Sequence, residues 1–185
     1  MPHIHTQPGD HDATVSAFIV RIGDNQNPKI LLHRHKKLNK LMQIGGHVET
    51  NENPWQAIIH EIREESGYEL RQLKILQSAP NLEQNPNSNA IYLPIPVLVN
   101  SHQFGEENHF HDDLSFAFLT TELPNGEPDE GETRDFHWVD LTELNTLGSD
   151  DIVKNTQEIS QYVLENFENW RAERVDKFGD KNGRL

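Results

Sequence analysis

The stretch from Gly45 to Tyr68, GGHVETNENPWQAIIHEIREESGY, most constrains what this chain can fold into. Asn53 can cap a helix, Pro54 suits the first helical position, and Gln56 can complete a capping box. Gly67 can take the left-handed conformation in which many helices end. These signals predict a helix that begins at Asn53 and ends at Gly67.

The expected helix has two different faces. Its apolar residues recur at helical spacing and predict one stripe facing a core, formed by Trp55, Ile58, Ile59 and Ile62. At about 100° per residue, Glu61, Glu64 and Glu65 gather on a separate face. Like charges at this spacing destabilise a helix by roughly 0.2–0.5 kcal/mol per pair, so a compensating cation is expected. Oxygen ligands suit a hard divalent cation, Mg²⁺ or alternatively Mn²⁺.

A solvated acidic face is the alternative interpretation of three glutamates on a helix. The preceding loop favours a binding site, because Gly45 and Gly46 allow a tight turn and a close approach of the backbone to a ligand. Glu49 and Glu52 add further carboxylates just ahead of the helix.

The same stretch resembles the signature of the Nudix hydrolases, which is a glycine, five residues, Glu, seven residues, then Arg-Glu-apolar-x-Glu-Glu-x-Gly-apolar. Gly46 supplies the first glycine and Glu52 the first acid. The rest of the pattern falls on Glu61, Ile62, Glu64, Glu65, Gly67 and Tyr68. A long motif with fixed spacing is far more specific than a short glycine pattern.

One position departs from the pattern, since His60 stands where the family has arginine. In the family, that arginine pairs with the acid matching Glu52 and steadies the loop. A protonated His60 could take this role, and Arg63 could do so in part, although it points about 60° further round the helix. We therefore expect a loop that is sensitive to pH.

The resemblance implies an α/β Nudix fold, an α/β/α sandwich with a central mixed β-sheet. It also implies metal-dependent hydrolysis of a diphosphate bond in a nucleoside diphosphate linked to another moiety. By the same likeness, Glu61, Glu64 and Glu65 are the expected catalytic residues and, with the Gly45 carbonyl, the expected metal ligands. Many members of the family are homodimers, so a homodimer is expected.

The charge balance restricts the partners. Asp and Glu number 30 against 16 Lys and Arg, for a formal net charge of −14. Affinity for bulk DNA or RNA depends on many basic side chains, so such a partner is not expected. A small phosphorylated substrate is compatible, because a metal and a few basic groups can supply local positive charge.

The chain has no cysteine, which excludes disulfides and thiolate metal ligands. Its N-terminus lacks the regions of a signal peptide, and no stretch of about 18 apolar residues could span a bilayer. We therefore predict a cytoplasmic protein with no membrane partner.

The length suits one domain with a proper core. We expect an arm over residues 1–12, a Nudix hydrolase domain over 13–170 and a charged tail over 171–185. The expected strands lie within 13–22, 29–33, 70–79, 91–100, 108–120 and 134–139, with an amphipathic helix in 150–170. Pro94 and Pro96 cannot donate ladder hydrogen bonds, which favours an edge position for 91–100.

Other residues are candidates for binding the substrate. Arg34, Lys36 and Lys37 belong to the densest basic run, which could meet phosphates or form a solvated turn. His111 and Asp113 open a later strand, which is a fair place for site residues or for a surface turn. The family commonly draws an extra carboxylate from outside the signature, and its further candidate sources are Asp112, Glu127, Glu130 and Glu132.

Two other functions compete with hydrolysis. A catalytically weak Nudix-fold module that binds nucleotides or regulates is the main alternative. The three intact helix glutamates argue against it, whereas His60 leaves some room for it. An isomerase of isoprenoid diphosphates shares the superfamily, but by family expectation it needs a cysteine, which this chain lacks.

Overall fold

The computed structural model describes residues 7–85, 87–104 and 109–179. Within them, strands join into a single mixed sheet with the central order β3-β2-β1-β7-β5-β9. The long strands β1 and β7 run parallel in its middle, and the other pairs are antiparallel. The strands are β1 (His11–Ile22), β2 (Pro28–Arg34), β3 (Leu41–Met42), β4 (Ile44–His47), β5 (Lys74–Gln77), β6 (Leu98–Phe104), β7 (His109–Thr120), β8 (Phe136–Val139) and β9 (Arg171–Arg174).

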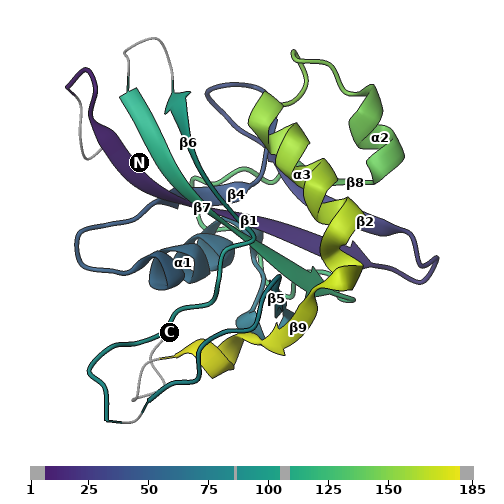
Figure 1. Ribbon diagram of the computed structural model, residues 1–185. Helices are drawn as coiled ribbons and strands as arrows, with labels where there is room; N and C mark the ends of the chain where they lie inside the picture. The colour runs from purple at the N-terminus through teal and green to yellow at the C-terminus, as the bar shows by residue number, and fades with distance from the viewer. Residues whose placement is uncertain (1–6, 86, 105–108, 180–185) are drawn as a thin grey trace.

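Helices cover both faces of this sheet (Figure 1). One face packs against α1 (Pro54–Ser66), and the other packs against α3 (Lys154–Asn166) with the short α2 (Leu141–Thr146) beside it. Single-turn 3₁₀ segments are η1 (Leu70–Gln72), η2 (Phe167–Asn169) and η3 (Val175–Phe178). The predicted α/β/α sandwich with a mixed sheet is confirmed.

Strand β1 shows why two layers of helix form. Successive side chains on a strand point to opposite faces. Val15, Ala17 and Ile19 join the core under α1, whereas Phe18 and Val20 join the core under α3. A strand that is apolar on both faces must be covered twice to remove its side chains from water.

Two expected strands differ from the structure. The strand predicted in 70–79 is only four residues long, Lys74–Gln77, because Leu70–Gln72 forms a 3₁₀ turn. The strand predicted in 91–100 starts at Leu98, after both prolines, and pairs with β7. Pro94 and Pro96 lie outside any strand, since a residue without an N–H cannot extend the ladder.

The C-terminal segment forms more structure than its charge suggests. Arg171–Arg174 is the strand β9, which pairs with β5. Val175 and Phe178 of η3 are buried in the core under α1, and the Phe178 ring centroid lies 6.0 Å from that of Trp55. These two apolar side chains fix a segment that charge alone would leave in solvent.

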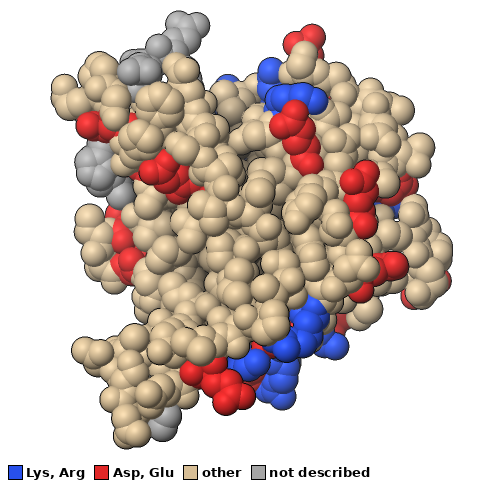
Figure 2. All heavy atoms as spheres, viewed as in Figure 1, with Lys and Arg blue, Asp and Glu red and all other residues tan. Residues whose placement is uncertain are grey.

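The surface carries separate groups of charge (Figure 2). On the face shown, Lys and Arg gather at the lower edge, over the region of β9. Acids lie among them, since Arg171 and Lys177 both pair with Glu173. Among the described residues, no helix combines the length and apolar character that crossing a bilayer requires.

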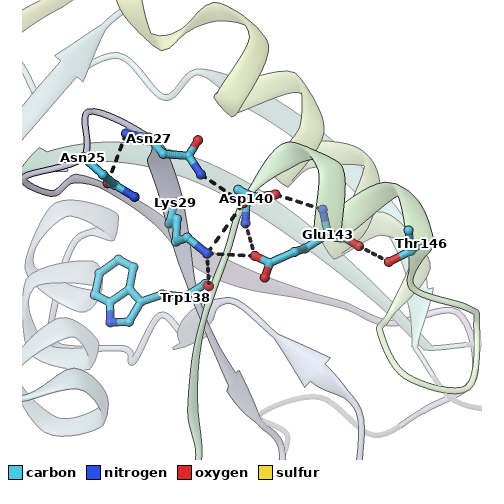
Figure 3. A network of polar contacts seen from close by, with 7 residues as sticks. All are labelled: Asn25, Asn27, Lys29, Trp138, Asp140, Glu143 and Thr146. Carbon is cyan, nitrogen blue, oxygen red and sulfur yellow. Dashed lines mark hydrogen bonds and ion pairs between the residues drawn. The ribbon is translucent and has the colours of Figure 1, made fainter.

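A polar network joins β2 to α2 (Figure 3). Lys29 Nζ lies 3.0 Å from Glu143 Oε2, which raises the pKa of Lys29. Asp140 caps α2 by accepting a hydrogen bond from the Glu143 backbone N–H at 2.9 Å. Asn27 donates to the same aspartate at 3.0 Å, so the turn before β2 is tied to the helix.

Candidate active site

The helix that carries the glutamates is positioned by the expected end signals. Asn53 Oδ1 accepts hydrogen bonds from the backbone N–H groups of Trp55 and Gln56, and the Gln56 side chain accepts one from the Asn53 N–H, each at 3.0 Å. Gly67 ends the helix in the left-handed conformation with φ of 70°. The predicted capping box and helix bounds are confirmed.

Two glycines let β4 lie directly against this helix. A Cβ atom on Gly46 would lie 2.0 Å from Glu61 Oε1, so a larger residue there would displace that carboxylate. Gly45 has a φ of 154°, and a Cβ there would lie 2.2 Å from the Val15 carbonyl oxygen. Its backbone N–H donates to Glu65 Oε2 at 3.0 Å. The loop expected at Gly45 and Gly46 is therefore part of strand β4, where Gly46 leaves room for Glu61 and Gly45 binds Glu65.

The site concentrates negative charge in a partly dry environment. Burial, followed by the charge of Glu64, raises the pKa of Glu61 to about 7. Burial also raises the pKa of Glu65 to about 8, although the hydrogen bond from Gly45 opposes this shift. Glu64 is 40 % exposed and lies at the solvent side. A divalent cation would favour the ionised forms of all three carboxylates.

His60 lies between two acids, as its position in the motif suggests. Its Nε2 is 2.9 Å from Glu64 Oε1, and its Nδ1 is 4.0 Å from Glu52 Oε2. Glu52 in turn accepts a hydrogen bond from the Glu49 backbone N–H at 3.0 Å. The imidazole thus reaches the acid that the family's arginine would pair with, but its nearer partner is a glutamate of the site.

The acidic loop at residues 122–133 closes on the same helix. The Asp129 N–H donates to the Glu64 carbonyl at 2.8 Å, and the Gly126 N–H donates to the Gly67 carbonyl at 3.0 Å. The charge of Glu132 contributes to the raised pKa values of Glu61 and Glu65. Among the loop glutamates considered as an extra carboxylate, Glu132 is therefore the one whose charge acts on the site.

A hollow of about 430 Å³ lies where this loop meets the end of α1. It is lined by Arg63, Gly67, Tyr68, Glu69, Leu70, Arg71, Gly126 and Glu127. Arg63 of α1 and Arg71 of η1 therefore both line this hollow, and Arg71 lies outside the motif.

The basic run lies in the turn between β2 and β3. Arg34 Nε is 3.2 Å from Asp135 Oδ2, and Lys36 Nζ donates to the Gly131 carbonyl. Lys37 is exposed. Lys36 thus reaches the loop that carries Glu132, whereas Arg34 is already paired with an acid.

His111 and Asp113 are buried in β7 rather than exposed in a turn. The Asp113 carboxylate accepts hydrogen bonds from the hydroxyls of Thr14, Ser16 and Ser115 at 3.1, 2.8 and 2.8 Å. By strand alternation, both residues share the face of Ala117, which packs under α3. The structure therefore places them across the sheet from the α1 glutamates.

Sequence patterns do not connect Asp12 and His47 with a site, whereas His109 belongs to the polar run that opens β7. The arm expected over residues 1–12 includes Asp12, but this residue lies in β1 with 1 % of its surface exposed. The alternation of His109 and His111 along an expected strand was the available signal, because it places both on one face.

Comparison with known proteins agrees with this architecture. The family model described as the NUDIX domain matches residues 11–159, most of the chain, so the chain belongs to the Nudix family. No curated protein matches the sequence.

Solved structures extend the likeness. A NUDIX-family hydrolase from Clostridium perfringens is 27% identical with a TM-score of 0.63, covering 83% of this chain and 96% of that one. The NUDIX domain of Shewanella oneidensis NrtR, crystallised with ADP ribose, is 12% identical with a TM-score of 0.60, covering 88% and 90%. An Ap4A hydrolase from C. elegans is 16% identical with a TM-score of 0.57, covering 85% and 96%. The last two share the fold alone.

Proposed function

We propose that this chain is a metal-dependent pyrophosphohydrolase that cleaves a diphosphate bond in a nucleoside diphosphate linked to another moiety. The observation that best supports this is the packing of Glu61 and Glu65 against Gly45 and Gly46 of β4. Burying carboxylates beside one another is unfavourable unless a proton or a cation compensates their charge. A protein that retains this arrangement on a Nudix fold is well suited to hold a divalent cation.

The donors fit a hard cation. Glu61, Glu64 and Glu65, with the Gly45 carbonyl, would hold Mg²⁺, or Mn²⁺ in its place, because these ions prefer oxygen ligands. When bound, such a cation supplies charge neutralisation at the phosphoryl oxygens and lowers the pKa of a water molecule.

The protein's own groups would position the substrate and accept a proton. Glu61, with a pKa near neutrality, is one candidate base, and Glu132 in the acidic loop is the other. Lys36, which contacts that loop, is the basic residue best placed to meet a phosphate, with Arg34 and Lys37 beside it in sequence. A substrate role for His111 and Asp113 stays a prediction, and it requires the substrate to reach the other face of the sheet.

The substrate class rests on chemistry shared by the structural neighbours' ligands. ADP ribose and Ap4A are named with two of them. Both compounds join a nucleoside to another moiety through phosphoanhydride bonds, as the proposal requires. A formal charge of −14 favours such small substrates over bulk nucleic acid. A cytoplasmic location and a homodimer belong to the same proposal.

The alternative, a Nudix module that binds without turnover, is favoured only by His60 in place of arginine. The contacts of His60 with Glu52 and Glu64 are made by a side chain that is 57% exposed, so they contribute little to stability.

A substrate panel tests the proposal. Purified protein with Mg²⁺ is incubated with ADP ribose, Ap4A, nucleotide sugars and nucleoside triphosphates, and release of monophosphate or phosphate is measured. We expect turnover of at least one compound and a loss of at least about 100-fold in Glu64→Gln, because a metal ligand is removed. Glu158→Gln on α3, also an exposed glutamate, should leave turnover unchanged. Tight binding of one compound without turnover of any would instead support the module.

A further inference from the structure

A group of side chains of the types that can bind metals lies at the end of the sheet where β1 and β7 begin side by side (Figure 1). Asp12, His109 and His111 each offer one ligand atom, and these atoms all lie within 4.8 Å of one another. Their exposed fractions are 1 %, 5 % and 9 %. Three potential ligands are therefore held together inside the protein rather than on its acidic surface.

The strand register explains why these residues meet. Asp12 is the partner of His111 in the parallel pairing of β1 with β7. His109 lies two residues before His111 and therefore points to the same face. The pairing of β1 with β4 sets His47 opposite Thr14, again on the face of Asp12. The strand register thus places Asp12, His47, His109 and His111 on the same face of the sheet.

His47 lies beside these three residues and is the candidate for a fourth donor. Its Nε2 lies 3.6 Å from Asp12 Oδ2, and the His109 Nε2 lies 3.1 Å from the same oxygen. The rings of His47 and His111 are 5.1 Å apart and nearly perpendicular, at 82°. Ligands of a tetrahedral zinc ion, at about 2.0–2.1 Å from the metal, lie roughly 3.3 Å from one another. The separations from Asp12 are already close to that value.

This group, the histidine cluster (Asp12, His47, His109 and His111), is separate from the glutamates of α1. Adjacent residues of β4 point to opposite faces of the sheet. Gly46 faces α1, since a Cβ there would meet Glu61, and His47 therefore faces the other layer. On that face, Thr156 of α3 donates to Gln43 at 2.5 Å, and Gln43 donates to Ser16 at 3.0 Å.

We propose that the histidine cluster binds one transition-metal ion, Zn²⁺ by its donor chemistry, as a structural centre that joins β1, β4 and β7. Imidazole nitrogen with one carboxylate suits Zn²⁺, whereas Mg²⁺ prefers a full set of oxygen ligands. With His47 as the fourth ligand, the ion would have no open position, as in structural rather than catalytic zinc sites.

Metal binding to the intact chain tests this centre. Protein stripped with a chelator is titrated with Co²⁺ and then with Zn²⁺, in excess Mg²⁺ that occupies oxygen-ligand sites. We expect one Co²⁺ per chain with the intense visible absorption of tetrahedral coordination, displaced by Zn²⁺, and a higher melting temperature with Zn²⁺. Glu64→Gln should behave in the same way. His111→Gln and Asp12→Asn should bind Zn²⁺ at least about 100-fold more weakly.

His11→Gln is the matched control, because His11 precedes Asp12 in β1 but is exposed and pairs with Asp112. It should retain the Co²⁺ spectrum. X-ray absorption of zinc-loaded Glu64→Gln needs no change in the cluster and should detect imidazole ligands, so it decides the matter even where a cluster variant fails to fold. A hydrogen-bonded network without metal would give no tetrahedral Co²⁺ spectrum in the parent protein. The absence of that spectrum would overturn the proposal. So would an equal Zn²⁺ affinity of the parent protein and His111→Gln, or a zinc ion with oxygen ligands alone.

Discussion

The acidic site of α1 and the histidine cluster differ in how the chain assembles them. Glu61, Glu64 and Glu65 come from consecutive turns of one helix, and β4 supplies the glycines beside them. The members of the histidine cluster come from three strands that lie far apart in the sequence. One site offers oxygen donors and the other mainly nitrogen donors, so a single sheet can separate two metal chemistries by using its two faces.

The largest expected effect concerns Gly45, the β4 glycine that contacts Glu65. Gly45→Ala should lower the free energy of unfolding by at least about 2 kcal/mol, because the new Cβ meets backbone of β1 and the residue has an unfavourable φ. Urea denaturation followed by circular dichroism measures this change. Gly23→Ala is the control, since its Cβ would meet nothing closer than 3.7 Å. Equal losses in the two variants would contradict a special fit at Gly45.

A change of pH tests the charge carried by the acidic site. In the folded protein, burial disfavours the ionised form of Glu65 and raises its pKa to about 8. The unfolded chain releases this proton at lower pH, so stability without metal should fall as pH rises from the unfolded value through 8. After allowance for solvent, we expect on the order of 1 kcal/mol between pH 6 and 8.

Thermal unfolding in chelator across this pH range measures the slope. Glu65→Gln should flatten it, and Mg²⁺ should do so in the parent protein by stabilising the ionised carboxylate. A parent slope that matches that of Glu65→Gln would show that Glu65 titrates normally.

The smallest expected effect concerns His60. His60→Arg should make activity vary less with pH between 6 and 8, because an arginine stays charged next to Glu52 and Glu64. The accompanying change in stability should be below about 1 kcal/mol, as for other exposed ion pairs. Initial rates at matched Mg²⁺ concentrations measure the profile. Superimposable profiles for parent and variant would remove His60 as the source of any pH dependence.

The sequence predicted the bounds and the buried face of α1 well because this information is local. The cap at Asn53, the stripe through Ile62 and the end at Gly67 all lie on one helix, so spacing alone locates the glutamates relative to one another. It could not reveal that Glu132 acts on them, because that depends on how a long loop returns to α1. For the same reason, the sequence does not show that Asp12 and His47 lie close together, because this depends on the strand register.

Burial was the other property that sequence patterns missed. The polar run at the start of β7 resembles a surface turn, yet Asp113 is 4 % exposed because hydroxyls on β1 and β7 satisfy its oxygens. Charged residues 171–174 suggested a tail, but the apolar residues just after them anchor the segment. In both cases a partner distant in sequence compensates for unfavourable local composition.

The contact between Phe178 and Trp55 has a practical consequence for anyone shortening this protein. The family match stops at residue 159, yet Phe178, about twenty positions later, packs against Trp55 on the helix that bears the glutamates. Trimming the polypeptide to the family boundary would uncover that tryptophan, and a trimmed enzyme found inactive would say little about its chemistry.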